Sequence, residues 1–169
     1  MRRIPTKDLG IVLGLFALSL LFFWPVTLGG KTLLPLDNLF TAQPWKPYAG
    51  DFGVTVPHNG LLSDLVLENY VWKRFILESL KARRVPLWNP YLFAGVPFLA
   101  AGQHSALYPL SVLYYVLPLP QAYGWFTLIQ FALTALFTFV YCRVIGLNRF
   151  AAVVGAITYT FSLFMIVQV

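Results

Sequence analysis

Residues 121–142 read QAYGWFTLIQFALTALFTFVYC, and this stretch decides the fold class of the 169-residue chain. It contains no Asp, Glu, Lys, Arg or Pro, and it exceeds the length of about 20 apolar residues that lets a helix cross the hydrocarbon core of a bilayer. The composition agrees, because 59% of the residues are hydrophobic and 11% are charged, against about 45–50% and about 25% in soluble domains. The sequence therefore predicts an all-α integral membrane protein.

Two further uncharged runs lead to a prediction of three transmembrane helices. Residues 9–30 form the first helix, 121–142 the second and 150–169 the third. The arm 1–8 and the turn 143–149 hold five Lys and Arg residues between them, and such residues favour the cytoplasmic side of a membrane. We therefore expect a cytoplasmic amino terminus, with the connection between the first two helices outside.

That outer connection, residues 31–120, is predicted to contain one amphipathic helix and an interfacial segment. No Pro or Gly interrupts the chain over about 63–84, where Ser63 can cap a helix that lies on the membrane or on other helices. Residues 105–119 are too short and too rich in proline to span, so they are expected to be interfacial or re-entrant. Seven Lys and Arg residues stand against five Asp and Glu residues over 31–84, a balance that does not suit a nucleic-acid-binding arm.

The cysteine and histidine content excludes several kinds of site. Cys142 is the only cysteine, which rules out an internal disulfide and a cysteine-rich zinc site. His58 and His104 lie too far apart in the sequence, and too far from Cys142, to form a recognisable metal motif. The sequence also lacks a Gly-rich phosphate loop, a nucleophile elbow and a CxxC pair.

Two acids of the outer loop are candidate catalytic residues. Asp37 follows the first predicted helix closely, so it should lie near the bilayer surface. A carboxylate there can accept a proton from an acceptor hydroxyl or bind a divalent cation. The alternative is a solvated loop acid or an Asx turn, which spacing alone favours. Asp64 presents the same choice, with helix capping as its structural explanation.

The stretch PLWNPYLF, residues 86–93, is dense in aromatic side chains and held by prolines. Trp88 or Tyr91 could stack against a sugar face, although such residues more often anchor a protein at the level of the lipid headgroups. A group of basic residues could contact lipid phosphates or, as the sharper hypothesis, a phosphate-bearing substrate. These residues are Lys73, Arg74, Lys81, Arg83 and Arg84.

Two stripes of small or polar residues follow helical spacing in the predicted spans. They predict helix-packing faces, and a polar stripe could instead line a cavity. The stripes are Thr127, Gln130, Thr134 and Thr138 in the second span, and Ala151, Gly155, Thr158 and Ser162 in the third. The predicted spans contain no charged residue, which gives little support to a lipid or ion transporter.

Several segments, taken in order, resemble the amino-terminal part of the YfhO-like bacterial membrane proteins, which belong with the multi-helix GT-C type of glycosyltransferase. The most specific is PLWNP within VPLWNPY at 85–91, and the ordered set is stronger than any single piece. The others are LLPLD at 33–37, SD at 63–64, GVP at 95–97, LYP at 107–109, RVIGLNR at 143–149, AA at 151–152 and YTFS at 159–162.

The resemblance implies a multi-pass protein of the bacterial plasma membrane. Such a protein moves a sugar from a polyprenyl-phosphate carrier to an acceptor at the outer face, and it needs no nucleotide cofactor. Asp37 matches the acid that serves as base or metal ligand, and Asp64 matches a second loop acid. Arg83 or Arg84 would hold the carrier phosphate and stabilise it as a leaving group. The other expected contacts to the lipid-linked sugar are Trp88, Asn89 and Tyr91.

The chain is shorter than members of this family, and this difference determines which partners we expect. Members of this family continue through more helices, so we expect membrane lipid, lipid-linked sugar and further transmembrane helices of the same or another chain as partners, and no nucleic acid. The chain alone is expected to be too short for activity. A non-catalytic transmembrane subunit, packed against a larger membrane complex, is the alternative that the two packing stripes favour.

Overall fold

The computed structural model describes residues 6–168, and most of the chain is helical, which confirms the prediction of a mainly α fold. The chain divides into two compact units. Residues 6–32 and 123–168 form what we call the helical unit, and residues 33–122 form the loop unit.

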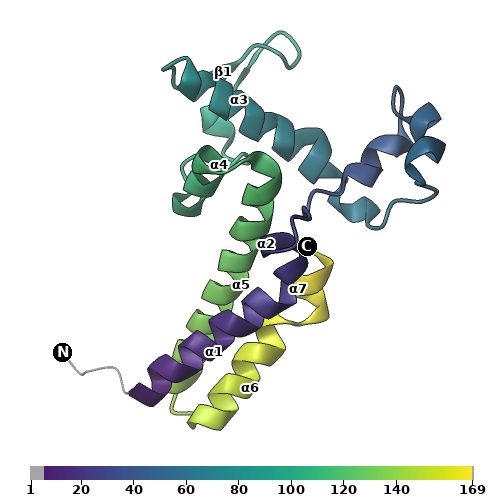
Figure 1. Ribbon diagram of the computed structural model, residues 1–169. Coiled ribbons are helices and arrows are strands. Elements are labelled where there is room, and N and C mark those ends of the chain that lie inside the picture. The colour runs from purple at the N-terminus through teal and green to yellow at the C-terminus, as the bar shows by residue number, and fades with distance from the viewer. Residues whose placement is uncertain (1–5, 169) are drawn as a thin grey trace. The chain divides into compact units, whose positions relative to one another are not determined.

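The helical unit consists of helices (Figure 1), and small residues pack against apolar ones in its core. Its described helices are α1 (Thr6–Phe22), α2 (Trp24–Thr27), α6 (Arg149–Thr160), α7 (Leu163–Val167) and, from residue 123 onward, α5 (Leu119–Val144). The buried core joins Leu15 of α1, Ala135 and Phe139 of α5, and Ala152 and Ala156 of α6. Alanine at these positions lets helix backbones approach closely, which is typical of helix packing in membranes.

Two helices in the described residues are long and apolar enough to cross a membrane. They are α5, which contains the predicted second span, and α6 with α7 counted together as Arg149–Val167. In their apolar windows only 28% and 17% of the residues are buried inside the chain. Most of their apolar side chains therefore face outward, unlike those of a helix in the core of a soluble domain.

The structure divides the helix predicted over 9–30. α1 has 17 residues and ends at Phe22, and α2 follows after a turn at Phe23. Pro25 explains the break, because it has no N–H for the carbonyl of Leu21 and its ring crowds that position. At 1.5 Å per residue, α1 measures about 26 Å. It is therefore not one of the two helices that meet the length for a membrane span.

The helix predicted over 150–169 is also divided. α6 ends at Thr160, and the backbone turns at Phe161 and extends at Ser162 before α7 begins. Val169 and residues 1–5 of the predicted arm lie outside the described residues.

An ion pair joins the beginnings of α1 and α6. Arg149 Nε lies 2.5 Å from Asp8 Oδ1. The N-terminus of α6 is capped by Asn148, whose Oδ1 accepts a hydrogen bond from the N–H of Ala151 at 2.9 Å. Asp8 of the predicted arm and Arg149 of the predicted turn therefore lie at the same end of the helical unit.

The loop unit is built from short helical turns around one longer helix. Its 3₁₀ turns are Leu36–Thr41, Lys46–Tyr48, Gly50–Phe52, Gly60–Leu62, Leu99–Ala101 and Pro109–Ser111. The longer helix begins at Ser63, passes through a π turn at Leu65–Asn69 and continues as α3 (Tyr70–Lys81). α4 (Val112–Val116) occupies the segment predicted to be interfacial and ends before Pro118.

The helix predicted over 63–84 ends three residues early. The backbone of Arg83 takes the left-handed conformation, with φ of +53°. The N–H of Arg84 turns back to the carbonyl of Ser79 at 2.8 Å, which closes the helix end. Pro86 then prevents a restart of the helix.

A two-stranded hairpin follows, which the sequence analysis did not predict. β1 (Trp88–Asn89) pairs antiparallel with β2 (Val96–Pro97). Trp88 lies opposite Pro97, and Asn89 lies opposite Val96.

Candidate functional site

The hairpin is held in shape by tight local contacts. Gly95 has φ of +103°, and a Cβ at this position would lie 2.4 Å from Trp88 Nε1. Only glycine therefore lets the chain pass the indole ring. Asn89 is buried, and its Oδ1 accepts a hydrogen bond from the N–H of Tyr91 at 2.9 Å. The PLWNPY motif thus fixes the positions of its own aromatic side chains.

Two clefts open where the hairpin meets α3. The larger has a volume of about 500 Å³ and is walled mainly by apolar and aromatic side chains, with Glu68, Arg74, Glu78 and Asn89 as charged or amide groups. The smaller has a volume of about 280 Å³. It shares Phe75, Glu78 and Tyr91 with the larger cleft and adds Arg84 and Trp88.

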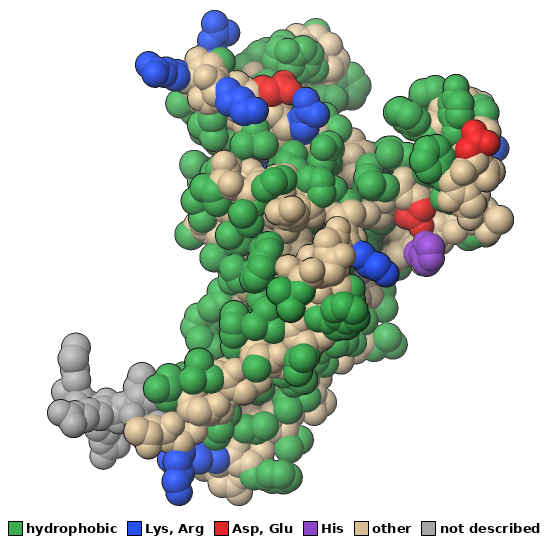
Figure 2. Space-filling model, in the orientation of Figure 1, with side chains coloured by type: hydrophobic (Ala, Val, Ile, Leu, Met, Phe, Trp, Pro, Cys, Tyr) green, Lys and Arg blue, Asp and Glu red, His purple; other side chains and the backbone are tan. Residues whose placement is uncertain are grey.

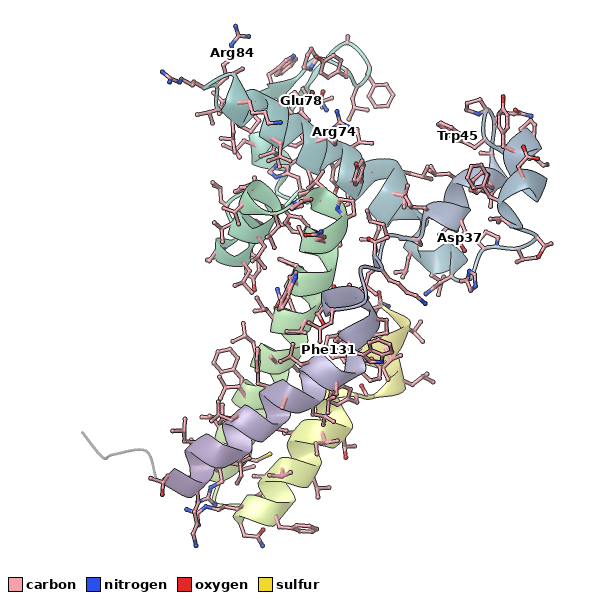
Figure 3. All side chains as sticks on the ribbon, viewed as in Figure 1. Asp37, Trp45, Arg74, Glu78, Arg84 and Phe131 are labelled. Carbon is pink, nitrogen blue, oxygen red and sulfur yellow. The ribbon has the colours of Figure 1, made fainter. Side chains whose placement is uncertain are left out.

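The charges at these clefts are partly compensated. Arg74 Nη2 donates to Glu78 Oε1 at 3.1 Å, and this hydrogen bond raises the pKa of the guanidinium group (Figure 3). Arg84, at the smaller cleft, forms no ion pair within the described residues. The smaller cleft therefore offers a cation beside two aromatic rings, Trp88 and Tyr91. Such a pairing suits an anion attached to a ring with an apolar face, because arginine binds phosphate and aromatic rings stack on sugars.

The structure brings some of the predicted substrate contacts together and leaves others apart. Arg84, Trp88 and Tyr91 border the smaller cleft, and Asn89 and Tyr91 border the larger one. Arg83 is exposed and borders neither of them.

The predicted acid Asp64 lies elsewhere on the same helix. It is exposed and borders a third cleft of about 320 Å³, together with Glu68, Trp72 and Gln103. It lies in the first turn of the helix, where a negative charge is favourable, but its side chain makes no capping hydrogen bond.

The predicted acid Asp37 is engaged by His58. Asp37 Oδ2 accepts a hydrogen bond from the backbone N–H of His58 at 2.7 Å. The same oxygen lies 2.8 Å from Nδ1 of the His58 ring. Burial of Asp37 alone would raise the pKa of the carboxyl group, but the hydrogen bonds from His58 outweigh it, so the pKa is lowered. The carboxylate is therefore ionised at neutral pH and is a weaker base than a free aspartate.

Asp37 and Arg84 lie toward opposite ends of the long helix of the loop unit (Figure 3). A helix over residues 63–81 measures about 28 Å at 1.5 Å per residue. One glycosyl-transfer centre cannot use both side chains across that length, because reacting groups must lie within about 3–3.5 Å. Among residues 6–168, no group of three or more His, Cys, Asp and Glu side chains gathers to hold a metal ion, and the partner of Asp37 is His58.

Sequence reasoning missed a buried lysine. Lys73, grouped above with possible phosphate ligands, is only 1% exposed. Its Nζ donates to the carbonyl of His104 at 2.6 Å and to Ser105 Oγ at 3.1 Å, and it lies 4.4 Å from the ring centre of Tyr114. Burial lowers the pKa of Lys73 to about 8. Helical spacing could have predicted the burial of Lys73, because residues three apart lie on the same face of a helix. Lys73 lies three residues before Ile76, which is buried.

Comparison with known proteins gives no match: no family model, no curated protein and no solved structure matches this chain.

Proposed function

We propose that this chain is the amino-terminal membrane portion of a GT-C-like glycosyltransferase, which uses a polyprenyl-phosphate sugar at the outer face of the bacterial plasma membrane. The observation that carries the proposal is the PLWNPY segment, whose Trp88 and Tyr91 border one cleft together with Arg84, a cation that forms no ion pair in residues 6–168. α5 and the α6–α7 pair would cross the membrane, and α1 continued by α2 would be the third crossing, with the amino terminus in the cytoplasm.

In this proposal the smaller cleft recognises the carrier end of the substrate. Arg84 would bind the carrier phosphate, Trp88 and Tyr91 would stack on the sugar, and Asn89 would keep the hairpin in shape. In the transfer, the acceptor oxygen bonds to the anomeric carbon, the bond from that carbon to the phosphate oxygen breaks, and the acceptor proton passes to a carboxylate.

Two carboxylates compete for that last role. Asp37 holds it by family resemblance, whereas Glu78 borders both clefts beside Arg84. Because Asp37 lies far from Arg84, a reaction centre at Asp37 would need a phosphate ligand from further helices. A reaction centre at the hairpin would use Glu78 as its base.

Transfer of labelled sugar from polyprenyl-phosphate carriers by the full-length protein tests the proposal. We expect Arg84→Gln and one of the pair Asp37→Asn and Glu78→Gln to abolish transfer. The exposed loop acid Asp51, changed to Asn, is the matched control and should retain transfer. Normal transfer by all four folded variants would refute the assignment of these residues.

The proposed orientation has a separate test. Single cysteines at positions 37 and 149 should react with an impermeant thiol reagent from opposite faces of intact cells. Reaction of both cysteines from the same face would overturn the topology and, with it, an outer-face reaction.

A non-catalytic subunit is the second candidate, and one observation favours it. Side chains of α5 and α6 border a surface groove of about 450 Å³, walled by Phe137, Thr138, Tyr141, Cys142, Gly155 and Tyr159. Such a groove suits a helix of another chain better than it suits a sugar. Purification in mild detergent distinguishes the two, because a subunit should retain a stoichiometric partner chain, and a transferase should not need one.

A further inference from the structure

The tip of the hairpin, between β1 and β2, projects apolar side chains outward. Phe93 is 99% exposed, and Tyr91 and Leu92 are exposed beside it. Val85 and Leu87, which precede β1, are exposed as well. Several exposed apolar side chains on one hairpin indicate a contact with a membrane or a partner.

The backbone holds Phe93 in this outward position. Phe93 has φ of +52°, a left-handed conformation that is rare for a bulky side chain. The N–H of Gly95 donates to the carbonyl of Leu92 at 2.8 Å, which closes the turn around Phe93. Strained residues persist where the surrounding structure fixes them, and they cluster at functional positions.

Basic residues lie at the end of α3, next to the segment that leads into the hairpin. Lys81, Arg83 and Arg84 are exposed at the end of α3, and none of them forms an ion pair in residues 6–168. The nearest acid along the helix, Glu78, is already paired with Arg74. Figure 2 shows Lys and Arg side chains gathered beside green apolar ones at this end of the loop unit.

We propose that this end of the loop unit is a bilayer-contacting surface. Phe93 and Leu92 enter the boundary between lipid headgroups and acyl chains, and Lys81, Arg83 and Arg84 contact the phosphates of anionic lipids. Apolar side chains rimmed by Lys and Arg are the combination that interfacial anchors use.

Charge and context favour a bilayer over a protein as the occupant. Three cations at the end of α3, which form no ion pair among the described residues, and exposed apolar side chains on the hairpin that follows complement anionic headgroups above an apolar phase. The same chain also carries two helices long and apolar enough to cross a membrane. The surface shares Arg84 with the proposed transferase cleft, but the inference does not depend on sugar transfer, because the membrane contact would serve either candidate function.

Depth measurement on the full chain tests this inference. In a Cys142→Ala background, a fluorescent label is attached at Phe93→Cys or at Phe52→Cys, and each protein is reconstituted into nanodiscs of equal parts phosphatidylcholine and phosphatidylglycerol. Phe52 is the matched control, because it is exposed, aromatic and adjacent to an acid, Asp51. Bromine on the acyl chains reports insertion, and aqueous iodide reports exposure.

We expect bromolipids to quench the label at 93 strongly and the label at 52 weakly. Replacing Lys81, Arg83 and Arg84 by Gln should lower the ratio of inserted to free tip about fivefold per residue in anionic nanodiscs, and much less in pure phosphatidylcholine. Quenching of position 93 by iodide as strong as that of position 52 would overturn the proposal. Protection from both quenchers would also overturn it, in favour of a protein contact. All nanodiscs lack polyprenyl carriers, so the result is independent of transferase activity.

Discussion

The buried amino group of Lys73 makes the stability of the loop unit depend on pH in an unusual direction. Its pKa falls from the ordinary 10.5 to about 8 in the folded chain, because burial disfavours the charged form. Between these values the folded chain binds fewer protons than the unfolded chain. Stability therefore rises with pH across this window, and the gain is lost as the pH falls to 8.

The size of the effect follows from the two pKa values. From pH 7 to pH 9.5, Lys73 should increase the free energy of unfolding by about 2 kcal/mol, an order-of-magnitude figure. Tyr114, whose ring faces the amino group of Lys73, sets the upper limit of the pH range. Burial raises the pKa of its phenol above the ordinary 10.0. The unfolded chain would lose that proton first above about pH 10, and stability would then fall again.

Lys73→Met isolates the contribution of this amino group. Methionine preserves the volume and removes the titration, so the stability difference between wild type and variant should change by about 2 kcal/mol over the same pH range. At pH 7 alone the variant is less informative. It relieves the buried charge but leaves the carbonyl of His104 without its donor, at a cost of about 1–3 kcal/mol.

Urea unfolding of the full chain in mild detergent measures the difference. Replacing Trp24 and Trp125 by Phe leaves tryptophan only in the loop unit, so its fluorescence reports that unit. The exposed Lys81, changed to Met, is the matched control and should show no such pH dependence. A wild-type minus Lys73→Met difference that stays flat from pH 7 to pH 9.5 would refute the buried-lysine argument.

Two further predictions concern glycines in close contacts. Gly95→Ala should destabilise the hairpin and shift the fluorescence of Trp88, because the new Cβ would meet the indole at 2.4 Å, whereas Gly102→Ala meets no atom within 4 Å and should cost only backbone strain. Gly124→Ala should loosen helix packing in thermal unfolding, because its Cβ would lie 2.0 Å from Val26 Cγ1. Val26→Ala should rescue that variant, and an additive double mutant would contradict the contact.

Hydropathy predicted where the helical unit has helices, but it did not predict that two of the three predicted helices are divided. The uncharged run of residues 121–142 lies within α5, because composition alone determines whether such a helix suits lipid. Pro25 indicates the break after α1 in the sequence, but the predicted span of residues 9–30 includes this proline. The buried small-residue face of α6 is Ala152 and Ala156, one position away from the predicted stripe, and this rotation depends on packing that spacing alone cannot fix.

The loop unit was less predictable because its contacts join distant residues. Asp37 meets His58 across 21 positions, and Lys73 meets His104 across 31. Irregular loops offer no periodicity from which such pairs could be read. Local chemistry was more informative, since the PLWNPY motif singled out the residues that border the two clefts around the hairpin.

The positions of the charged groups now constrain the proposed chemistry. A leaving phosphate needs a cation and an attacking hydroxyl needs a base, and both must meet at one anomeric carbon. The hairpin end of α3 supplies Arg84 beside Glu78, and Arg84 forms no ion pair in the described part of the chain. Asp37 instead lies beside His58. If sugar transfer depends on Glu78 rather than Asp37, this chain contributes a reaction centre at the hairpin. If it depends on Asp37, the chain contributes an acid, and the phosphate ligand comes from helices outside it.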